Sequence, residues 1–139
     1  MANSRSKGGD RDSRWSRGTA AYASQFGVRE DEVFNLLAGS LGERMATEAI
    51  NAAGGAWSDD VLSQRERSLI VVAALAAQGG VEERLRLHVR WALAHGVTVE
   101  ELDAAAALLA VYIGYPRASV AMQVIGEELG RPRLPSARD

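Results

Sequence analysis

Residues 63–80, SQRERSLIVVAALAAQGG, decide the fold class of this 139-residue chain. Ser63 stands three residues before Glu66, which is the spacing of a capping box, in which each side chain binds the backbone N–H of the other residue. The run from Leu69 to Ala77 is apolar around the whole helix, and two glycines end it. A helix of this kind belongs in the centre of a core or an interface.

The same helical punctuation recurs on both sides of this stretch. Residues 30–53 carry apolar side chains at helical spacing and precede the pair Gly54-Gly55. Residues 98–113 begin with a second capping box, and residues 116–130 begin with a proline, which is tolerated in a first helical turn. No segment alternates between apolar and polar residues as a half-buried strand does, and no internal repeat is visible. The sequence therefore predicts an all-α fold.

Composition places the chain among ordinary soluble globular proteins. Apolar residues make up 47%, charged residues 24%, and the net charge is −2, so no large field attracts nucleic acid or an anionic membrane. Residues 1–17 are polar, with five basic and two acidic side chains. We expect a disordered basic tail over 1–17, a single helical domain over 18–130 and a C-terminal tail over 131–139. A basic arm that touches nucleic acid is the alternative for the N-terminal segment.

The absence of cysteine removes several kinds of chemistry from this chain. Disulfides, thiolate nucleophiles and zinc thiolate sites all require cysteine. The two histidines and the carboxylates show no metal-ligand spacing, so no metal site is expected. The first residues lack the apolar core of a signal peptide, and the longest apolar run is too short to span a bilayer. We therefore expect a cytoplasmic protein with no membrane partner.

A histidine lies in the middle of the amphipathic segment 82–96, EERLRLHVRWALAHG. One helical stripe of this segment consists of Val81, Leu85, His88 and Ala92. The opposite, polar face consists of Glu82, Arg86 and Arg90. His88 is thus turned toward the core, where an imidazole in a partly dry cleft holds or delivers a proton near neutral pH. The alternative is a buried histidine with satisfied ring nitrogens. His95, near the helix end, is expected to face solvent.

Arginine and tyrosine side chains surround this stripe in the sequence. Arg67 follows the capping box, and a guanidinium turned inward there would clamp a carboxylate, whereas Arg65 is expected to be solvated. Tyr112 and Tyr115 flank a glycine between two helices. Either tyrosine counts as functional only if its hydroxyl points into a cleft.

Three segments of the chain resemble the carboxymuconolactone decarboxylase family. They are residues 62–80 (LSQRERSLIVVAALAAQGG), 82–102 (EERLRLHVRWALAHGVTVEEL) and 109–122 (LAVYIGYPRASVAM). Residues 20–60 look like a looser match to the family's N-terminal helices. The resemblance implies an all-α domain of about six helices, of the alkylhydroperoxidase-like superfamily, that assembles as a trimer or hexamer.

The family has a branch that reduces peroxides with a CxxC pair on the helix that carries the histidine. The corresponding places here fall near Val81 and Arg84, and no thiol exists. That branch also places a glutamate near the start of the apolar helix, where this sequence has Ser68. The resemblance therefore points to the cysteine-free, decarboxylase-like branch, whose members use neither a metal nor an organic cofactor.

This branch implies a carboxy-lyase acting on 4-carboxymuconolactone, or on a related small carboxylated lactone, in aromatic-compound catabolism. His88 matches the candidate acid that protonates carbon, Arg67 would orient a carboxylate, and Tyr112 would donate to the developing enolate oxygen. Further expected substrate-binding residues are Arg86, Arg90, Tyr115 and Trp57. Trp91 is a second candidate wall of the site. Arg117 stands where relatives more often have a small residue, and in a pocket it would change charge and volume.

Two other functions fit the same residues. One is a tailoring or proton-transfer enzyme that uses the scaffold on a different cyclic acid. The other is a non-catalytic helical oligomer that binds a small acid or a protein, with His88 sealed in packing and no cavity beside it. Fold-level similarity alone does not choose among the three.

Overall fold

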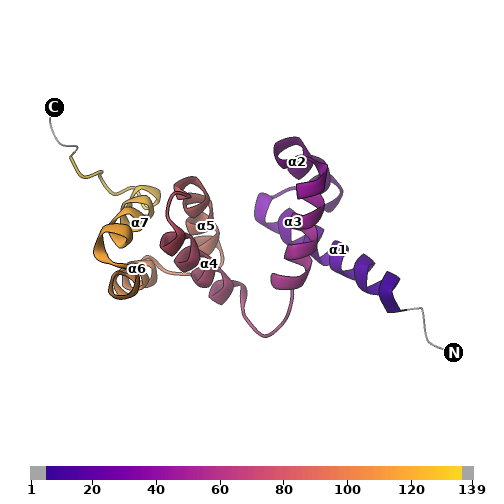
Figure 1. Ribbon diagram of the computed structural model, residues 1–139, viewed down its shortest axis with the longest axis horizontal. Coiled ribbons are helices and arrows are strands. Elements are labelled where there is room, and N and C mark those ends of the chain that lie inside the picture. The colour runs from indigo at the N-terminus through magenta and orange to yellow at the C-terminus, as the bar shows by residue number, and fades with distance from the viewer. Residues whose placement is uncertain (1–5, 136–139) are drawn as a thin grey trace. The chain divides into compact units, whose positions relative to one another are not determined.

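The computed structural model describes residues 6–135, with side chains from residue 13 onward (Figure 1). Within these residues there are seven helices and no strand, which confirms the all-α prediction. The helices are α1 (Ser6–Phe26), α2 (Glu30–Leu41), α3 (Glu43–Ala56), α4 (Gln64–Gln78), α5 (Glu82–Ala94), α6 (Val99–Ile113) and α7 (Tyr115–Glu128). They form two compact units. One unit ends at Val61 and the other begins at Leu62.

The first unit is a three-helix arrangement in which α1, α2 and α3 each pack against the other two (Figure 1). Two pairs of aromatic rings pack at the edge of its core. The ring centroids of Trp15 and Phe34 lie 5.9 Å apart, and Tyr22 stacks on Phe26 with ring centroids 5.4 Å apart. The buried residues of its core are Ala23, Val33, Leu37, Ala46 and Ile50.

Helix α1 occupies most of the segment in which composition predicts a disordered tail. It runs so close to α3 that their backbones nearly touch. A Cβ at Gly18 would lie 1.9 Å from the carbonyl oxygen of Ile50, and a Cβ at Gly54 would lie 1.8 Å from that of Arg14. Arg17 Nε also donates to the Gly54 carbonyl over 3.1 Å. This contact with α3 stabilises α1, although the residue composition of α1 does not favour a helix. Residues 1–5 and 136–139 of the two expected tails lie outside the described residues.

The stretch 30–53, which reads as one helix, is two helices with a break at Gly42. Gly42 has a φ of 83°, a left-handed conformation that favours glycine over other residues, and its N–H donates to the Ala38 carbonyl. The expected stop at Gly54-Gly55 does not occur, because α3 continues through both glycines to Ala56. Gly54 is needed for the close approach of α1, and this overrides its tendency to end a helix.

The second unit consists of α4–α7, and both predicted capping boxes are present in it. The Glu66 N–H donates to Ser63 Oγ over 3.1 Å, and the Glu101 N–H donates to Thr98 Oγ1 over 3.2 Å. Helix α5 packs on α4 and α7, and α6 packs on α4 and α7. The buried core consists of Val72, Ala76, Leu85, Val89, Ala92, Val97, Leu102, Ala106, Ala121, Val124 and Ile125.

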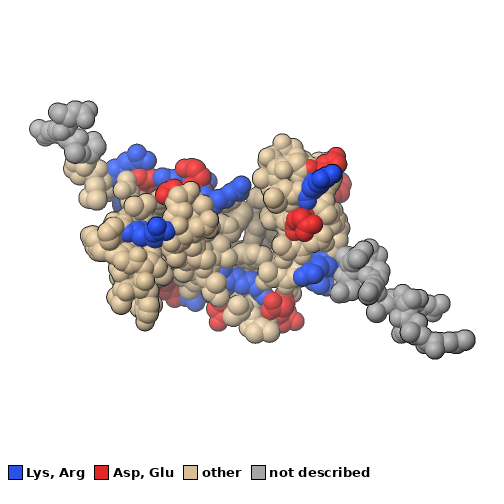
Figure 2. All heavy atoms as spheres, in the orientation of Figure 1, with Lys and Arg blue, Asp and Glu red and all other residues tan. Residues whose placement is uncertain are grey.

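Large apolar side chains remain on the surface of this second unit. Ile70 of the apolar helix α4 is 54% exposed, and Leu108 and Val111 of α6 are 61% and 78% exposed. The surface over α6 in Figure 2 is drawn mostly as uncharged residues, whereas acidic and basic side chains are interspersed elsewhere. No helix among the described residues has the length and apolar character needed to cross a bilayer.

Candidate functional site

His88 lies on α5 between the buried side of that helix and its polar face. Leu85, Val89 and Ala92 are buried on the core side, while His88 is only partly exposed and its Nδ1 is fully covered. One turn further, Trp91 stands edge-on to the imidazole, with ring centroids 4.7 Å apart and an angle of 85° between the planes. The ring is therefore held by an aromatic neighbour of its own helix in a place of low polarity.

These surroundings favour the neutral imidazole. Burial lowers the pKa of His88 below its ordinary value, and the nearby positive charge of Arg84 lowers it further. At neutral pH the imidazolium is thus a minor species. A proton delivered from His88 to a substrate would first have to be taken up from solvent or from the substrate itself.

Arg67 belongs to the first turns of α4, directly after the capping box. It is 7% exposed, and a guanidinium so covered is retained only with polar partners, as the predicted inward orientation requires. Its neighbour Ser68 contacts His95 at the end of α5, so the start of α4 lies beside the end of α5. Arg67, the residue before Ser68, therefore has its backbone near the end of α5.

The contact between Ser68 and His95 was not predicted from the sequence. Ser68 Oγ lies 2.7 Å from His95 Nδ1, and Ser68 is 1% exposed. His95 was expected to face solvent, which is wrong, because α4 covers this end of α5 and leaves the ring partly buried. Burial also lowers the pKa of His95. Arg65 forms an ion pair with Glu101, and its side chain stays 39% exposed.

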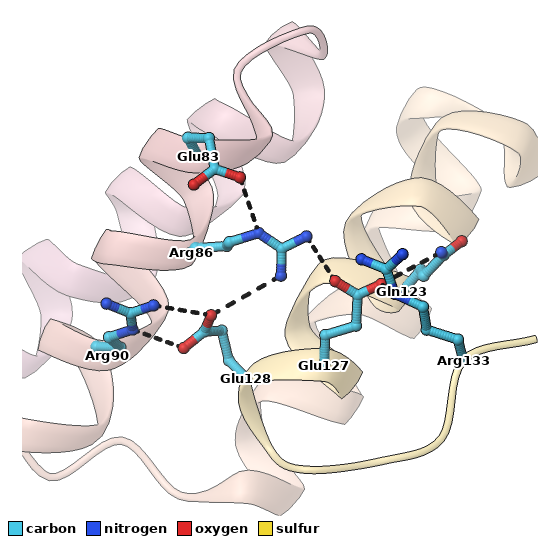
Figure 3. Close-up of polar contacts among 7 residues, drawn as sticks. All are labelled: Glu83, Arg86, Arg90, Gln123, Glu127, Glu128 and Arg133. Atoms are coloured by element: carbon cyan, nitrogen blue, oxygen red, sulfur yellow. Dashed lines mark hydrogen bonds and ion pairs between the residues drawn. The ribbon is translucent and has the colours of Figure 1, made fainter.

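Arg86 and Arg90 join α5 to the end of α7 (Figure 3). Arg86 Nη2 lies 2.5 Å from Glu127 Oε2, and Arg90 Nε lies 2.6 Å from Glu128 Oε2. Arg133 reaches the other oxygen of Glu127 over 2.7 Å. The hydrogen bond from Arg86 holds the pKa of Glu127 below its usual range, and the bond from Arg90 does the same for Glu128. Both guanidinium groups thus bind carboxylates of the protein itself.

Tyr112 and Tyr115 lie on open surface at the junction of α6 and α7. Their exposed fractions are 79% and 76%, and Gly114 between them turns the chain with a φ of 87°. Trp57, the remaining residue predicted to bind a substrate, lies at the C-terminal cap of α3 in the first unit, where it is partly buried.

Two pockets are found in the second unit. The first has a volume of about 390 Å³ and lies between α6, α7 and the segment 131–134. The second has a volume of about 670 Å³ and lies where the end of α4, the start of α5 and α7 meet. Among the predicted site residues, Tyr115 lines the first pocket, and His88 and Arg67 line neither. In the part of the chain that the structure describes, no three histidine or acidic side chains are grouped as metal ligands.

A family model matches the helices that carry these residues. The model described as the carboxymuconolactone decarboxylase family matches residues 45–127, which run from α3 to the last turn of α7. The chain belongs to the carboxymuconolactone decarboxylase family. It is also 37% identical over 74 residues to the 4-carboxymuconolactone decarboxylase of Acinetobacter baylyi (strain ATCC 33305 / BD413 / ADP1). That match covers 53% of this chain and 54% of the relative, so the chain spans about half the length of the curated relative it matches.

The family match places the decarboxylase-like helices mainly in the second unit. All of α4, α5 and α6 lie within it, together with His88, Arg67 and Tyr112, whereas α1 and α2 lie outside it. Membership therefore supports a decarboxylase-like enzyme built on the helix that carries His88.

The lowered pKa values of the two histidines predict how stability of this family member depends on pH. In the folded chain His88 and His95 stay neutral below their ordinary pKa of about 6.5, whereas in the unfolded chain they take up protons there. The unfolded state binds more protons, so the free energy of unfolding falls as pH drops from about 7 to about 5. The carboxylates with lowered pKa values, such as Glu127, reduce the free energy of unfolding only at lower pH, where they become protonated.

Urea unfolding followed by circular dichroism at several pH values measures this dependence. The double variant His88→Gln, His95→Gln should show a flatter profile between pH 7 and 5 than the wild type. An equally steep profile in the double variant between pH 7 and 5 would contradict the assignment to these histidines.

Proposed function

We propose that this chain is a cofactor-free carboxy-lyase that decarboxylates 4-carboxymuconolactone, or a related small carboxylated lactone, in aromatic-compound catabolism. The observation that carries the proposal is the family match across α4–α7, which includes the helix with His88. The name and partial identity of the Acinetobacter baylyi relative support the substrate class.

This reaction requires the protein to orient the substrate and to supply one proton. The bond between the ring carbon and its carboxylate breaks, CO₂ leaves, and the electron pair passes through the conjugated double bond to the lactone carbonyl. The resulting dienolate is then protonated at the carbon next to that carbonyl. We assign this protonation to His88, orientation of a carboxylate to Arg67, and stabilisation of the enolate oxygen to Tyr112.

The surroundings of His88 suit this role. The covered ring and its contact with Trp91 provide a site of low polarity, which favours loss of a carboxylate whose charge disperses as CO₂ departs. The lowered pKa of His88 leaves the ring neutral in the resting enzyme, so the decarboxylation rate is expected to rise as pH falls toward that pKa.

We also propose that the site is completed by a second copy of this chain in a trimer or hexamer. Tyr112 and Tyr115 are largely exposed in the single chain and adjoin the exposed residues Leu108 and Val111. A neighbouring copy on this face would cover an apolar surface and exclude water from the tyrosine hydroxyls. Arg86, Arg90 and Trp57 would then support the site by holding helices in place.

Turnover of 4-carboxymuconolactone by the purified chain tests the proposal. We expect loss of the ultraviolet absorbance of the unsaturated lactone with release of one CO₂ per molecule consumed. The rate per chain should fall on dilution to concentrations where light scattering shows the assembly dissociating. Absence of CO₂ release at concentrations where the chain is assembled and folded would overturn this function.

A second candidate function is the binding of a small cyclic acid without decarboxylation. The observation that favours it is that the two pockets found in the second unit are lined by neither His88 nor Arg67. A proton-transfer enzyme acting on a different cyclic acid is part of the same alternative. Arg117 lines the larger pocket, where its charge would suit an acid other than the carboxylated lactone. Either function would leave the carboxylated lactone intact in the assay above.

A further inference from the structure

We propose that the larger pocket, where the end of α4 and the start of α5 meet α7, binds a small monocarboxylate with an apolar body. Arg117 would hold its carboxylate. His88 does not line this pocket, although Val81 and Leu85 of the same helical stripe do. The proposal does not depend on the decarboxylase function.

Arg117 is fixed by the end of α4 through only one of its nitrogens. Its Nη1 donates to the Ala77 carbonyl over 2.8 Å and to the Gln78 carbonyl over 2.5 Å. Carbonyls at the end of a helix lack partners within the helix, and a cation there is favoured by the helix dipole. Nε and Nη2 remain, and within the described chain Arg117 forms no ion pair. The guanidinium is thus held through Nη1, and Nε and Nη2 can donate to a ligand.

The backbone at the α4–α5 turn is shaped around this guanidinium. A Cβ at Gly79 would lie 2.9 Å from Arg117 Nη1 and 3.2 Å from Cζ, so a larger residue there would displace the end of this side chain. The φ of Gly79 is +67°, which also favours glycine. Gly79 thus leaves room for the guanidinium of the exposed Arg117 beside the turn, where its two hydrogen bonds to α4 hold it.

The pocket around Arg117 has the size and lining of a small-molecule site. Its volume of about 670 Å³ lies within the usual range of about 300–1,000 Å³. Its aliphatic walls include Leu75, Val81, Leu85, Ile113 and Val120. Val81 begins α5 without a side-chain cap, so the positive end of that helix dipole adds to the attraction for an anion.

The charges in the pocket favour one carboxylate over a phosphate or a dicarboxylate. Glu82 also lines the pocket and opposes a second negative charge, as do the carbonyls at the end of α4. The guanidinium edge that remains matches the two oxygens of one carboxylate. The rest of the ligand would lie against aliphatic side chains, which favour a hydrocarbon chain or ring.

Calorimetric titration of the full chain with sodium hexanoate, compared with the uncharged hexanamide, tests this assignment. We expect hexanoate to bind and hexanamide to bind at least about 10-fold more weakly. Arg117→Gln should weaken hexanoate binding by about 10-fold or more, and Arg117→Lys by less, because lysine keeps the charge and loses the paired donors. Glu82→Gln should tighten binding by a few-fold, since it removes the opposing charge.

Arg117→Gln also removes the hydrogen bonds that Arg117 donates to the end of α4, which can destabilise the chain. The test therefore needs a second variant that keeps these bonds. Val120 is 47% exposed on α7, and Val120→Trp would fill the pocket while the bonds of Arg117 to α4 remain. We expect Val120→Trp to abolish hexanoate binding with little change in melting temperature. Equal binding of hexanoate by the wild type and Val120→Trp, or of hexanoate and hexanamide by the wild type, would overturn the proposal. Neither result bears on lactone turnover.

Discussion

Replacing His88 with alanine should lower the rate of 4-carboxymuconolactone decarboxylation by about 100-fold or more while the chain stays folded. General acid catalysis by a positioned side chain contributes roughly 10²–10⁴-fold, and alanine leaves no group at this position to protonate the dienolate. The wild-type rate should rise as pH falls toward the lowered pKa of His88, and this rise should be absent in the variant.

His95→Ala is the matched control, because it removes the same kind of side chain from the same helix about two turns away. His95 contacts Ser68 rather than the ring pair formed by His88 and Trp91, so its loss should change the rate by no more than a few-fold. Circular dichroism and melting temperature confirm that both variants are folded. Equal losses of rate in the two variants, or full activity of His88→Ala, would contradict the role assigned to His88.

Replacing Gly18 with alanine should destabilise the first unit by about 3 kcal/mol or more. The added Cβ would lie 1.9 Å from the carbonyl oxygen of Ile50, and this oxygen belongs to the backbone of α3 and cannot turn away as a side chain can. Overpacking usually costs about 1–3 kcal/mol, and a clash with backbone lies at the upper end because α1 and α3 must separate.

Gly39→Ala is the control for this substitution. Gly39 also lies within a helix, α2, and nothing approaches within 4 Å of its Cβ position. Alanine there should stabilise the helix by about 0.5–1 kcal/mol, because it restricts the unfolded chain more than glycine does. Guanidinium denaturation of both variants measures the difference. A Gly18→Ala variant as stable as Gly39→Ala would show that α1 and α3 do not approach as closely as described.

Local sequence signals predicted the second unit well. Helices α4 and α6 begin at capping residues whose partners lie three positions along the chain, so Ser63 with Glu66 and Thr98 with Glu101 could be read directly. The first unit was predicted less well, because its decisive feature is a contact between α1 and α3 across more than 30 residues. No local pattern shows that the polar segment before Gly18 is stabilised by the backbone of α3.

The same distinction applies to the candidate site. The spacing of apolar residues correctly placed His88 beside the buried face of α5. The partners of His95, Arg86 and Arg90 come from α4 and α7, and which helices would be neighbours does not follow from periodicity. Arg86 and Arg90, which the sequence predicts to bind a substrate, bind carboxylates of α7 in the structure.

The network in Figure 3 constrains how this sequence can change over evolutionary time. Glu127 and Glu128 stand at the end of α7, where the helix dipole opposes negative charge, and Arg86, Arg90 and Arg133 offset that opposition. Loss of Glu128 would remove the carboxylate partner of Arg90, and loss of Glu127 would leave Arg86 with Glu83 and Glu128 as partners. Substitutions at these positions in α5 and α7 are therefore expected to be accepted in pairs, so that the two helices co-vary rather than drift independently.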